Sequence, residues 1–521
     1  MARDSKRRTR RVLWPLIVTL VPLLIYLLTL APTVLWGDDA YFQRTACTGE
    51  LRPDGGGHWL WLQAARLFVR LPWGDVAFRS NLLSAIAATG TILVLYAAAR
   101  QAGLRRDAAA VAVISLAVGH TFWMHAVRAE VYSVFTFFVA LHFWLWARWR
   151  PDEKQPEAGF FRDARPLYGG AAVFGLTLLA HQMALLLFPA WIVFVWLQRG
   201  SLRGAQVGKA TAFLIAGLVP FFLVVESQIV LVANVSMIRA VWLYFTQAGA
   251  DFSSSFFDFS LAAMPRDLAT WALLTLLQFC SPALVLIPWG LVDRLRSGRP
   301  KVWIPLLAFY LFDVLFAVSY RVNDRYAFLL PGYVALALFT GAGWQAARAA
   351  LASRQRPSTV SVAMAGVLVA GSVLVLVMPI AVYYVAPRAM AALNLNPLDV
   401  RRLPGREPNA FFLWPGKGGY LGARQYGEQT LAALPPAATL FADHTPLETL
   451  RYLQAVEGIR PDVQILKIEP GENLAPLIDS LPPESPIYLA DDNTDYYNLL
   501  SLPEADLIAT GPVYRLKRQE R

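Results

Sequence analysis

Long apolar stretches separated by short polar connections dominate the chain up to about residue 386. A membrane-spanning helix needs about 20 mostly apolar residues. Stretches of this kind cover residues 12–31, 80–99, 107–126, 131–148, 210–231, 268–290, 302–320, 326–347 and 358–386. The pattern therefore predicts a multi-pass α-helical membrane protein.

One further apolar segment, residues 168–198, is too long for a single span, because as one helix it would measure about 46 Å. Basic residues flank both of its ends. If both flanks are cytoplasmic, the chain must cross an even number of times. Two short helices that break near His181 and Gln182 satisfy this condition. The prediction becomes about 11 transmembrane helices.

Charge adds an orientation to this picture. The chain has 56% hydrophobic and 16% charged residues and a net charge of +11. The basic excess lies in the apolar part, mainly in short connections that we expect to be cytoplasmic, and this favours a membrane protein over a nucleic-acid partner. The first apolar stretch is long for a cleaved signal peptide and shows no small-x-small cleavage site before Trp36. We therefore expect a retained first helix, a cytoplasmic N-terminus and an inner or plasma membrane location.

These patterns predict three regions. Residues 1–11 form a basic cytoplasmic N-terminus, residues 12–386 a transmembrane domain with a first external loop at 32–79, and residues 387–521 a soluble extracytoplasmic α/β domain. The last region predicts a strand, a helix and a strand over 437–467, and two more strands at 486–490 and 507–516. The only cysteines, Cys47 and Cys280, exclude a disulfide scaffold, and we expect them not to pair.

The predicted external side carries the unusual polar residues. Asp38 and Asp39 follow the first helix, and a glycine run ends at His58, after which residues 59–70 have the pattern of an interfacial helix. The second outer loop runs from His125 through Arg128 to Glu130, and a third, at 321–325, also holds cations and a carboxylate.

Carboxylates beside cations at one membrane surface suit the transfer of a sugar from a lipid phosphate. The phosphate leaves as an anion and needs little protonation. A carboxylate can act as general base on an acceptor hydroxyl. Arginine can stabilise the charge that develops on the departing phosphate.

Several short motifs occur in an order that resembles glycosyltransferase family 117, also described as the DUF2723 domain, of the protein O-mannosyltransferase type. They include Pro32-Thr33-Val34 with Gly37-Asp38, Phe78-Arg79-Ser80-Asn81, Ala129-Glu130-Val131-Tyr132, Arg325-Tyr326 and Leu440-Phe441-Ala442-Asp443. The resemblance implies a GT-C-like membrane glycosyltransferase with a polyprenyl-phosphate-linked sugar as donor and a protein or glycan as acceptor. It also implies that an acidic residue of the first external loop is the catalytic base, and Asp38 stands at that position. The chain departs from the family at Asp39-Ala40-Tyr41 and at residues 54–58.

Together these arguments give a set of candidate residues. The catalytic candidates are Asp38, Asp39 and Glu130, and the substrate-binding candidates are His58, His125, Arg128, His181, Arg325 and Tyr326. Each has a structural alternative: the aspartates could cap a helix, Arg128 could simply pair with Glu130, and His181 could bond a neighbouring helix.

The tripeptide Asp443-His444-Thr445, at the end of a predicted strand, could recognise an acceptor or form a structural cap over the active site. The sequence predicts no metal ligands but leaves open a divalent metal. It also leaves open two other functions, a membrane transporter or lipid flippase and a non-catalytic partner of a cell-envelope enzyme.

Overall fold

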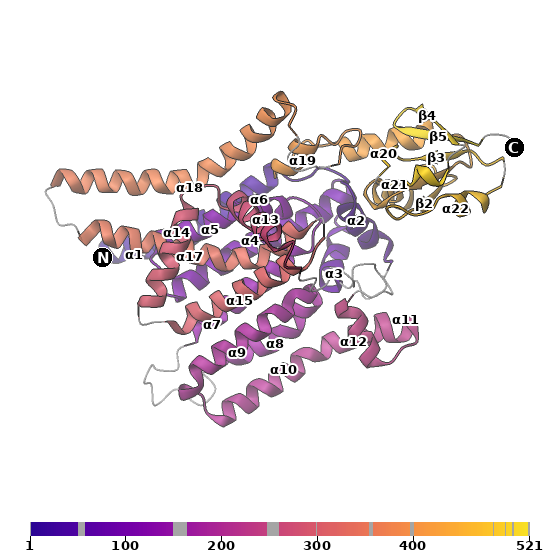
Figure 1. The fold of residues 1–521 in the computed structure, drawn as a ribbon. Helices are drawn as coiled ribbons and strands as arrows, with labels where there is room; N and C mark the ends of the chain where they lie inside the picture. The colour runs from indigo at the N-terminus through magenta and orange to yellow at the C-terminus, as the bar shows by residue number, and fades with distance from the viewer. Residues whose placement is uncertain are drawn as a thin grey trace.

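The computed structural model describes residues 2–50, 58–149, 164–246, 260–297, 300–322, 324–353, 358–395, 401–482, 484–494, 496–502 and 505–518. A bundle of helices forms most of the molecule, and a small α/β domain lies at one end of it (Figure 1). The longer helices of the bundle are α1 (Ala2–Leu28), α4 (Val76–Gln101), α5 (Arg106–Ala117), α7 (Tyr132–Arg148), α8 (Arg165–Ala180), α9 (Leu187–Gln198), α10 (Gly204–Val225), α13 (Met264–Gln278), α14 (Ala283–Arg296), α15 (Pro300–Ser319), α17 (Leu330–Ser353) and α18 (Ser358–Ala392).

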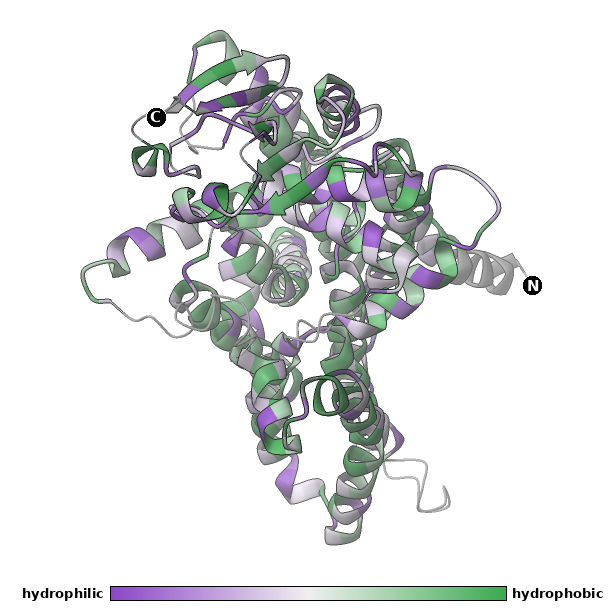
Figure 2. Cartoon of the chain, turned by 90° about the vertical axis from the view of Figure 1, so that its right-hand side faces the viewer, coloured by the Kyte–Doolittle hydropathy of each residue, from purple (hydrophilic) through white to green (hydrophobic). Residues whose placement is uncertain are grey.

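Apolar helices make this an integral membrane protein. Within the described residues, five helices are long and apolar enough to cross a membrane, and two sharply bent helix pairs raise the number to as many as seven. Hydrophobic residues dominate the helices that extend away from the α/β domain (Figure 2). The count of 11 spans stays a prediction, as does the orientation of the termini.

The expected break at His181 is confirmed. Helix α8 ends at Ala180, and His181 has an extended backbone with φ −164° and ψ 141°, after which the chain turns back into α9. A Cβ atom on Gly170, near the start of α8, would lie 2.3 Å from the ring of Trp191 in α9. The two helices therefore pack as a tight antiparallel hairpin, which returns the chain to the side from which it came.

Two of the predicted spans are sharply bent helix pairs in the structure. The span 107–126 consists of α5 and α6 (His120–Ala126), bent by 70°, and the span 268–290 consists of α13 and α14, bent by 105°. The two breaks meet, because the Gln278 side chain accepts a hydrogen bond from the Thr121 N–H, 2.9 Å away. A Cβ atom on Gly119 would lie 2.0 Å from the Gln278 amide nitrogen. The glycine thus leaves room for a side chain that satisfies a backbone group freed by the break.

Small residues let helices of the bundle approach closely. A Cβ atom on Gly290 of α14 would lie 2.0 Å from the carbonyl oxygen of Phe339 in α17, and one on Gly343 of α17 would lie 2.0 Å from that of Leu286. Close packing of this kind is the main source of helix association in lipid, where apolar burial provides no driving force.

The C-terminal domain holds a five-stranded sheet with the order β2-β1-β3-β5-β4. Its strands are β1 (Thr439–Ala442), β2 (Gln464–Lys467), β3 (Ile487–Leu489), β4 (Ala505–Thr510) and β5 (Val513–Arg518). The first three pair in parallel, and β5 pairs antiparallel with both β3 and β4. The prediction of one strand over 507–516 is wrong, because Gly511, with φ +65°, turns the chain into a hairpin.

The predicted division between the two domains is blurred in the structure. Helix α18 continues past residue 386 to Ala392. The hydrophobic core of the C-terminal domain also contains four residues from the region of the first external loop, listed here: Val34, Trp36, Ala40 and Ala77. This loop is therefore packed into the C-terminal domain and held by it.

Candidate functional site

The loop after the first helix, predicted to be external, places a carboxylate at the start of helix α2 (Asp38–Thr48). Gly37 precedes it with φ +55° and ψ −126°, a conformation that disfavours any residue with a side chain. Asp38 and Asp39 then occupy the first turn, where the partial positive charge of the helix N-terminus favours carboxylates. The Asp38 side chain is 55% exposed, whereas Asp39 is buried.

Arg128 is the cation at the centre of the site. Its guanidinium lies 3.6 Å from the Asp39 carboxylate and 3.1 Å from that of Glu130. It also donates a hydrogen bond of 3.2 Å to the hydroxyl of Tyr326 in α16 (Arg325–Phe328). Three separate segments of the chain thus meet around one buried arginine, as the sequence-based grouping of these residues expects.

His125 lies next to Arg128 in this cluster. Its Nδ1–H donates to the carbonyl of Thr121 at 2.7 Å, which leaves Nε2 as an acceptor 3.4 Å from the Arg128 guanidinium. Its ring also packs against that of Tyr326, with 5.8 Å between ring centres. The histidine is held in one tautomer by the backbone of its own helix.

A small cavity of about 100 Å³ opens among these groups. Its lining residues are Trp36, Asp38, Asp39, His125, Arg128, Glu130, Asp324, Tyr326 and Ala327. Asp324 was not among the candidates, although its loop was noted in the sequence. Four carboxylates therefore surround one guanidinium.

The crowding of carboxylates shifts their protonation. Burial, with a smaller contribution from Asp38, raises the pKa of Asp39 to about 7 against the opposing effect of Arg128. Asp324 is accessible to solvent. Desolvation by the surrounding protein, with a smaller contribution from the charge of Asp38, nevertheless raises its pKa to about 6. Burial also raises the pKa of Glu130. Asp39 and Asp324 therefore exchange protons near neutral pH, as groups that assist proton transfer do.

The C-terminal domain contributes one contact to the site that the list of candidates lacks. The Nε2 atom of His444, the first residue of α21 (His444–Glu457), lies 3.0 Å from Oδ1 of Asp38. Its position after a predicted strand was a weak signal in the sequence, but nothing linked it to Asp38, from which 406 positions separate it.

Three candidates lie beside the cavity and do not line it. The rings of His58 and His181 stand 4.9 Å apart, and His181 lies 5.1 Å from the ring of Tyr132, which in turn contacts His125. Arg325 donates to the Asp267 carboxylate at 2.8 Å. The histidines thus extend an aromatic wall away from the cavity, while Arg325 is engaged in an ion pair.

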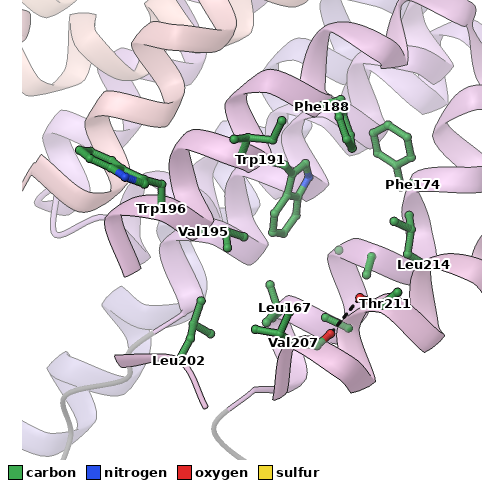
Figure 3. A pocket seen from close by; sticks show the side chains of 14 residues that line it. Leu167, Phe174, Phe188, Trp191, Val195, Trp196, Leu202, Val207, Thr211 and Leu214 are labelled. Atoms are coloured by element: carbon green, nitrogen blue, oxygen red, sulfur yellow. Dashed lines mark hydrogen bonds between the residues drawn. The ribbon is translucent and has the colours of Figure 1, made fainter. Parts of the chain in front are cut away.

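A larger cavity, of about 450 Å³, lies between α8, α9 and α10, at the end of the hairpin far from His181 (Figure 3). Its labelled side chains are almost all apolar, and the hydroxyl of Thr211 is bonded to the carbonyl of Val207. This cavity offers no group for acid–base chemistry. Across the described ranges, no cluster of three or more His, Cys, Asp or Glu residues could hold a metal ion. Cys47 and Cys280 are both free thiols, as expected.

Comparisons with known proteins show which sequence family and which folds the chain is similar to. Residues 54–203 match a family model described as the protein O-mannosyl-transferase TMEM260 N-terminal domain. No curated protein matches the sequence. The crystal structure of ArnT from Cupriavidus metallidurans bound to undecaprenyl phosphate is similar over 98% of both chains, with a TM-score of 0.57 and 14% identity.

Two other solved structures share the architecture. The apo oligosaccharyltransferase of Archaeoglobus fulgidus has a TM-score of 0.50 at 12% identity, over 87% of this chain and 64% of its own. The mycobacterial arabinofuranosyltransferase AftD has a TM-score of 0.51 at 13% identity, over 98% of this chain and 40% of its own. The chain has the GT-C glycosyltransferase fold. The O-mannosyltransferase type inferred from the sequence motifs agrees with the family model, and the inferred GT-C-like fold agrees with the solved structures.

Proposed function

We propose that this protein transfers a sugar from a polyprenyl-phosphate carrier to a hydroxyl group of a protein or glycan on the outer side of the membrane, with Asp38 as general base. The observation that carries the proposal is the cavity in which an accessible carboxylate faces a buried arginine at one end of a bundle of apolar helices. The undecaprenyl phosphate bound to the similar ArnT structure supports a lipid-phosphate donor.

The reaction is a single displacement. Asp38 takes the proton of the acceptor hydroxyl while its oxygen attacks the anomeric carbon. The bond between that carbon and the phosphate oxygen breaks, and polyprenyl phosphate leaves with the electron pair. The product sugar is inverted at the anomeric carbon.

Accessibility favours Asp38 over Asp39 as the base. The Asp38 side chain is 55% exposed, so an acceptor can reach it, whereas Asp39 is 2% exposed and paired with Arg128. We assign to Asp39 and Glu130 the role of holding Arg128 in place.

Among the candidate cations, Arg128 is best situated to meet the departing phosphate, because it lines the cavity and Arg325 is bound to Asp267. A guanidinium in a partly dry site stabilises a developing phosphate charge more strongly than one in water.

The test is sugar transfer by the purified, detergent-solubilised protein. The donors are undecaprenyl phosphate carrying labelled mannose, glucose or arabinofuranose, and the acceptors are serine- and threonine-containing peptides or cell-envelope glycan. We expect transfer from one donor, with Asp38→Asn about 1,000-fold slower, in the range expected for loss of a general base.

Full activity of Asp38→Asn would show that the base is wrongly assigned. Asp293→Asn provides the matched control, because this aspartate lies in α14 and pairs with Arg294, outside the cavity. If the protein moves labelled donor across vesicle membranes and transfers no sugar, it is a transporter and the proposal fails.

A further inference from the structure

The contact between the C-terminal domain and the first external loop falls on the proposed catalytic carboxylate. His444 Nε2 lies 3.0 Å from Asp38 Oδ1. We propose that His444 is a positioning residue, which holds the Asp38 carboxylate in the orientation needed to accept a proton. This inference rests on the proposed function of Asp38.

The direction of the hydrogen bond follows from the groups. An ionised carboxylate only accepts, so the histidine Nε2–H donates. The imidazole thereby holds one carboxylate oxygen, Oδ1, in place. His444 is not among the residues that line the cavity, so the contact reaches Asp38 from outside the cavity lining.

His444 is itself held firmly. It is the first residue of α21, and the preceding Asp443 caps that helix by accepting from the Thr445 N–H at 3.1 Å. Arg401 donates to the Asp443 carboxylate at 2.7 Å, and the Tyr497 hydroxyl donates to it at 3.0 Å. Asp443, Arg401 and Tyr497 all belong to the C-terminal part of the chain. They hold the start of α21, and with it the backbone that carries the imidazole.

The same helix also fixes the backbone on which Asp38 is placed. The Gly37 N–H donates to the carbonyl of Thr445 at 3.0 Å, and the Thr449 hydroxyl donates to the carbonyl of Leu35 at 2.8 Å. The Trp36 indole N–H donates to the Tyr420 hydroxyl at 2.7 Å. Backbone and side chain of the loop are therefore aligned by one domain, as precise placement of a catalytic group requires.

A further contact lies farther along helices α2 and α21. Arg44 of α2 donates to the Glu448 carboxylate of α21 at 3.0 and 3.2 Å, and both side chains are buried. This ion pair keeps α2 and α21 together when His444 is replaced. A substitution at His444 therefore tests orientation and leaves the docking of the domain intact.

The experiment compares two neutral replacements in the same transfer assay. His444→Phe keeps the ring shape without a donor, and His444→Gln keeps an N–H at a similar reach. We expect His444→Phe to lower kcat about tenfold with an unchanged KM for the donor, and His444→Gln to recover most of the lost rate. Ala455→Ser, at an exposed position of α21, is the matched control.

A double variant separates this inference from the proposed function. If His444 acts through Asp38, His444→Phe has no further effect in the Asp38→Asn background. An inactive Asp38→Asn with a fully active His444→Phe would overturn the positioning role and leave the base in place. An equal loss for Phe and Gln, or a loss that appears in KM or in thermal stability alone, would also overturn it.

Discussion

Replacing Arg128 with methionine tests the electrostatic centre of the site. The arginine is 6% exposed and lies between the carboxylates of Asp39 and Glu130, which are 2% and 8% exposed. Methionine fills a similar volume but removes the charge, so two buried carboxylates lose their cation. Breaking a buried ion pair from one side costs about 3–5 kcal/mol. The N-terminus of α2 offsets about 0.5–1 kcal/mol of this at Asp39. We expect a net loss of about 3 kcal/mol in the free energy of unfolding.

The pH dependence makes this prediction specific. Burial already raises the pKa of Asp39 to about 7 and that of Glu130 above its usual value, and the loss of Arg128 raises both further. A carboxyl that binds its proton more tightly in the folded state destabilises folding as the pH rises above its unfolded pKa of about 4. The loss in the free energy of unfolding of Arg128→Met, relative to the wild type, is therefore small at about pH 5 and larger at about pH 8.

Thermal unfolding of the detergent-solubilised protein at these two pH values is the assay. The triple variant Arg128→Met, Asp39→Asn, Glu130→Gln removes all three charges, so we expect it to regain part of the stability and none of the transfer activity. A deficit that is equal at both pH values, or below about 1 kcal/mol, would refute the view that Arg128 neutralises these carboxylates.

Two further predictions concern packing and protonation. Gly290→Val should lower the unfolding temperature strongly, because a Cβ atom there would lie 2.0 Å from the Phe339 carbonyl oxygen, whereas Gly366→Val should have little effect, because nothing lies within 4 Å of a Cβ atom at that position. Since the pKa of Asp324 is raised to about 6, its folded form holds the proton more tightly, and wild-type stability falls as the pH rises from about 4 to about 6. Asp324→Asn should lose less stability over that interval, and an identical pH profile for the two proteins would contradict the assignment.

Whether a structural feature could be predicted from the sequence depended mainly on whether the residues that produce it are close together in the chain. The break at His181 was predictable, because an overlong apolar stretch with basic residues at both ends is a local signal. The bend at Gly119 was not predictable, because the Gln278 side chain that satisfies the freed backbone group lies 157 positions from its Thr121 partner. The hairpin at Gly511 was missed although its signal was local, because apolar residues on both sides resembled one strand.

The residues of the site also differ in whether a local signal in the sequence predicted them. Asp38, Asp39, Arg128 and Glu130 could be grouped because each lies next to a predicted span on the same expected side. His444 could not be joined to them from the sequence, because a strand-to-helix junction in a separate domain shows no sign of where that domain docks.

This docking also sets the order in which the site is completed. Residues 34–40 include three members of the core of the C-terminal domain, whose other members, apart from Ala77, lie between residues 403 and 516. A chain made from its N-terminus inserts its apolar helices first, and the loop that carries Asp38 finds its packing partners only when the last quarter of the chain has folded. Removal of the C-terminal domain would therefore expose Trp36, break the backbone hydrogen bond of Gly37 and remove the imidazole contact of Asp38, so the membrane bundle alone does not contain a complete site.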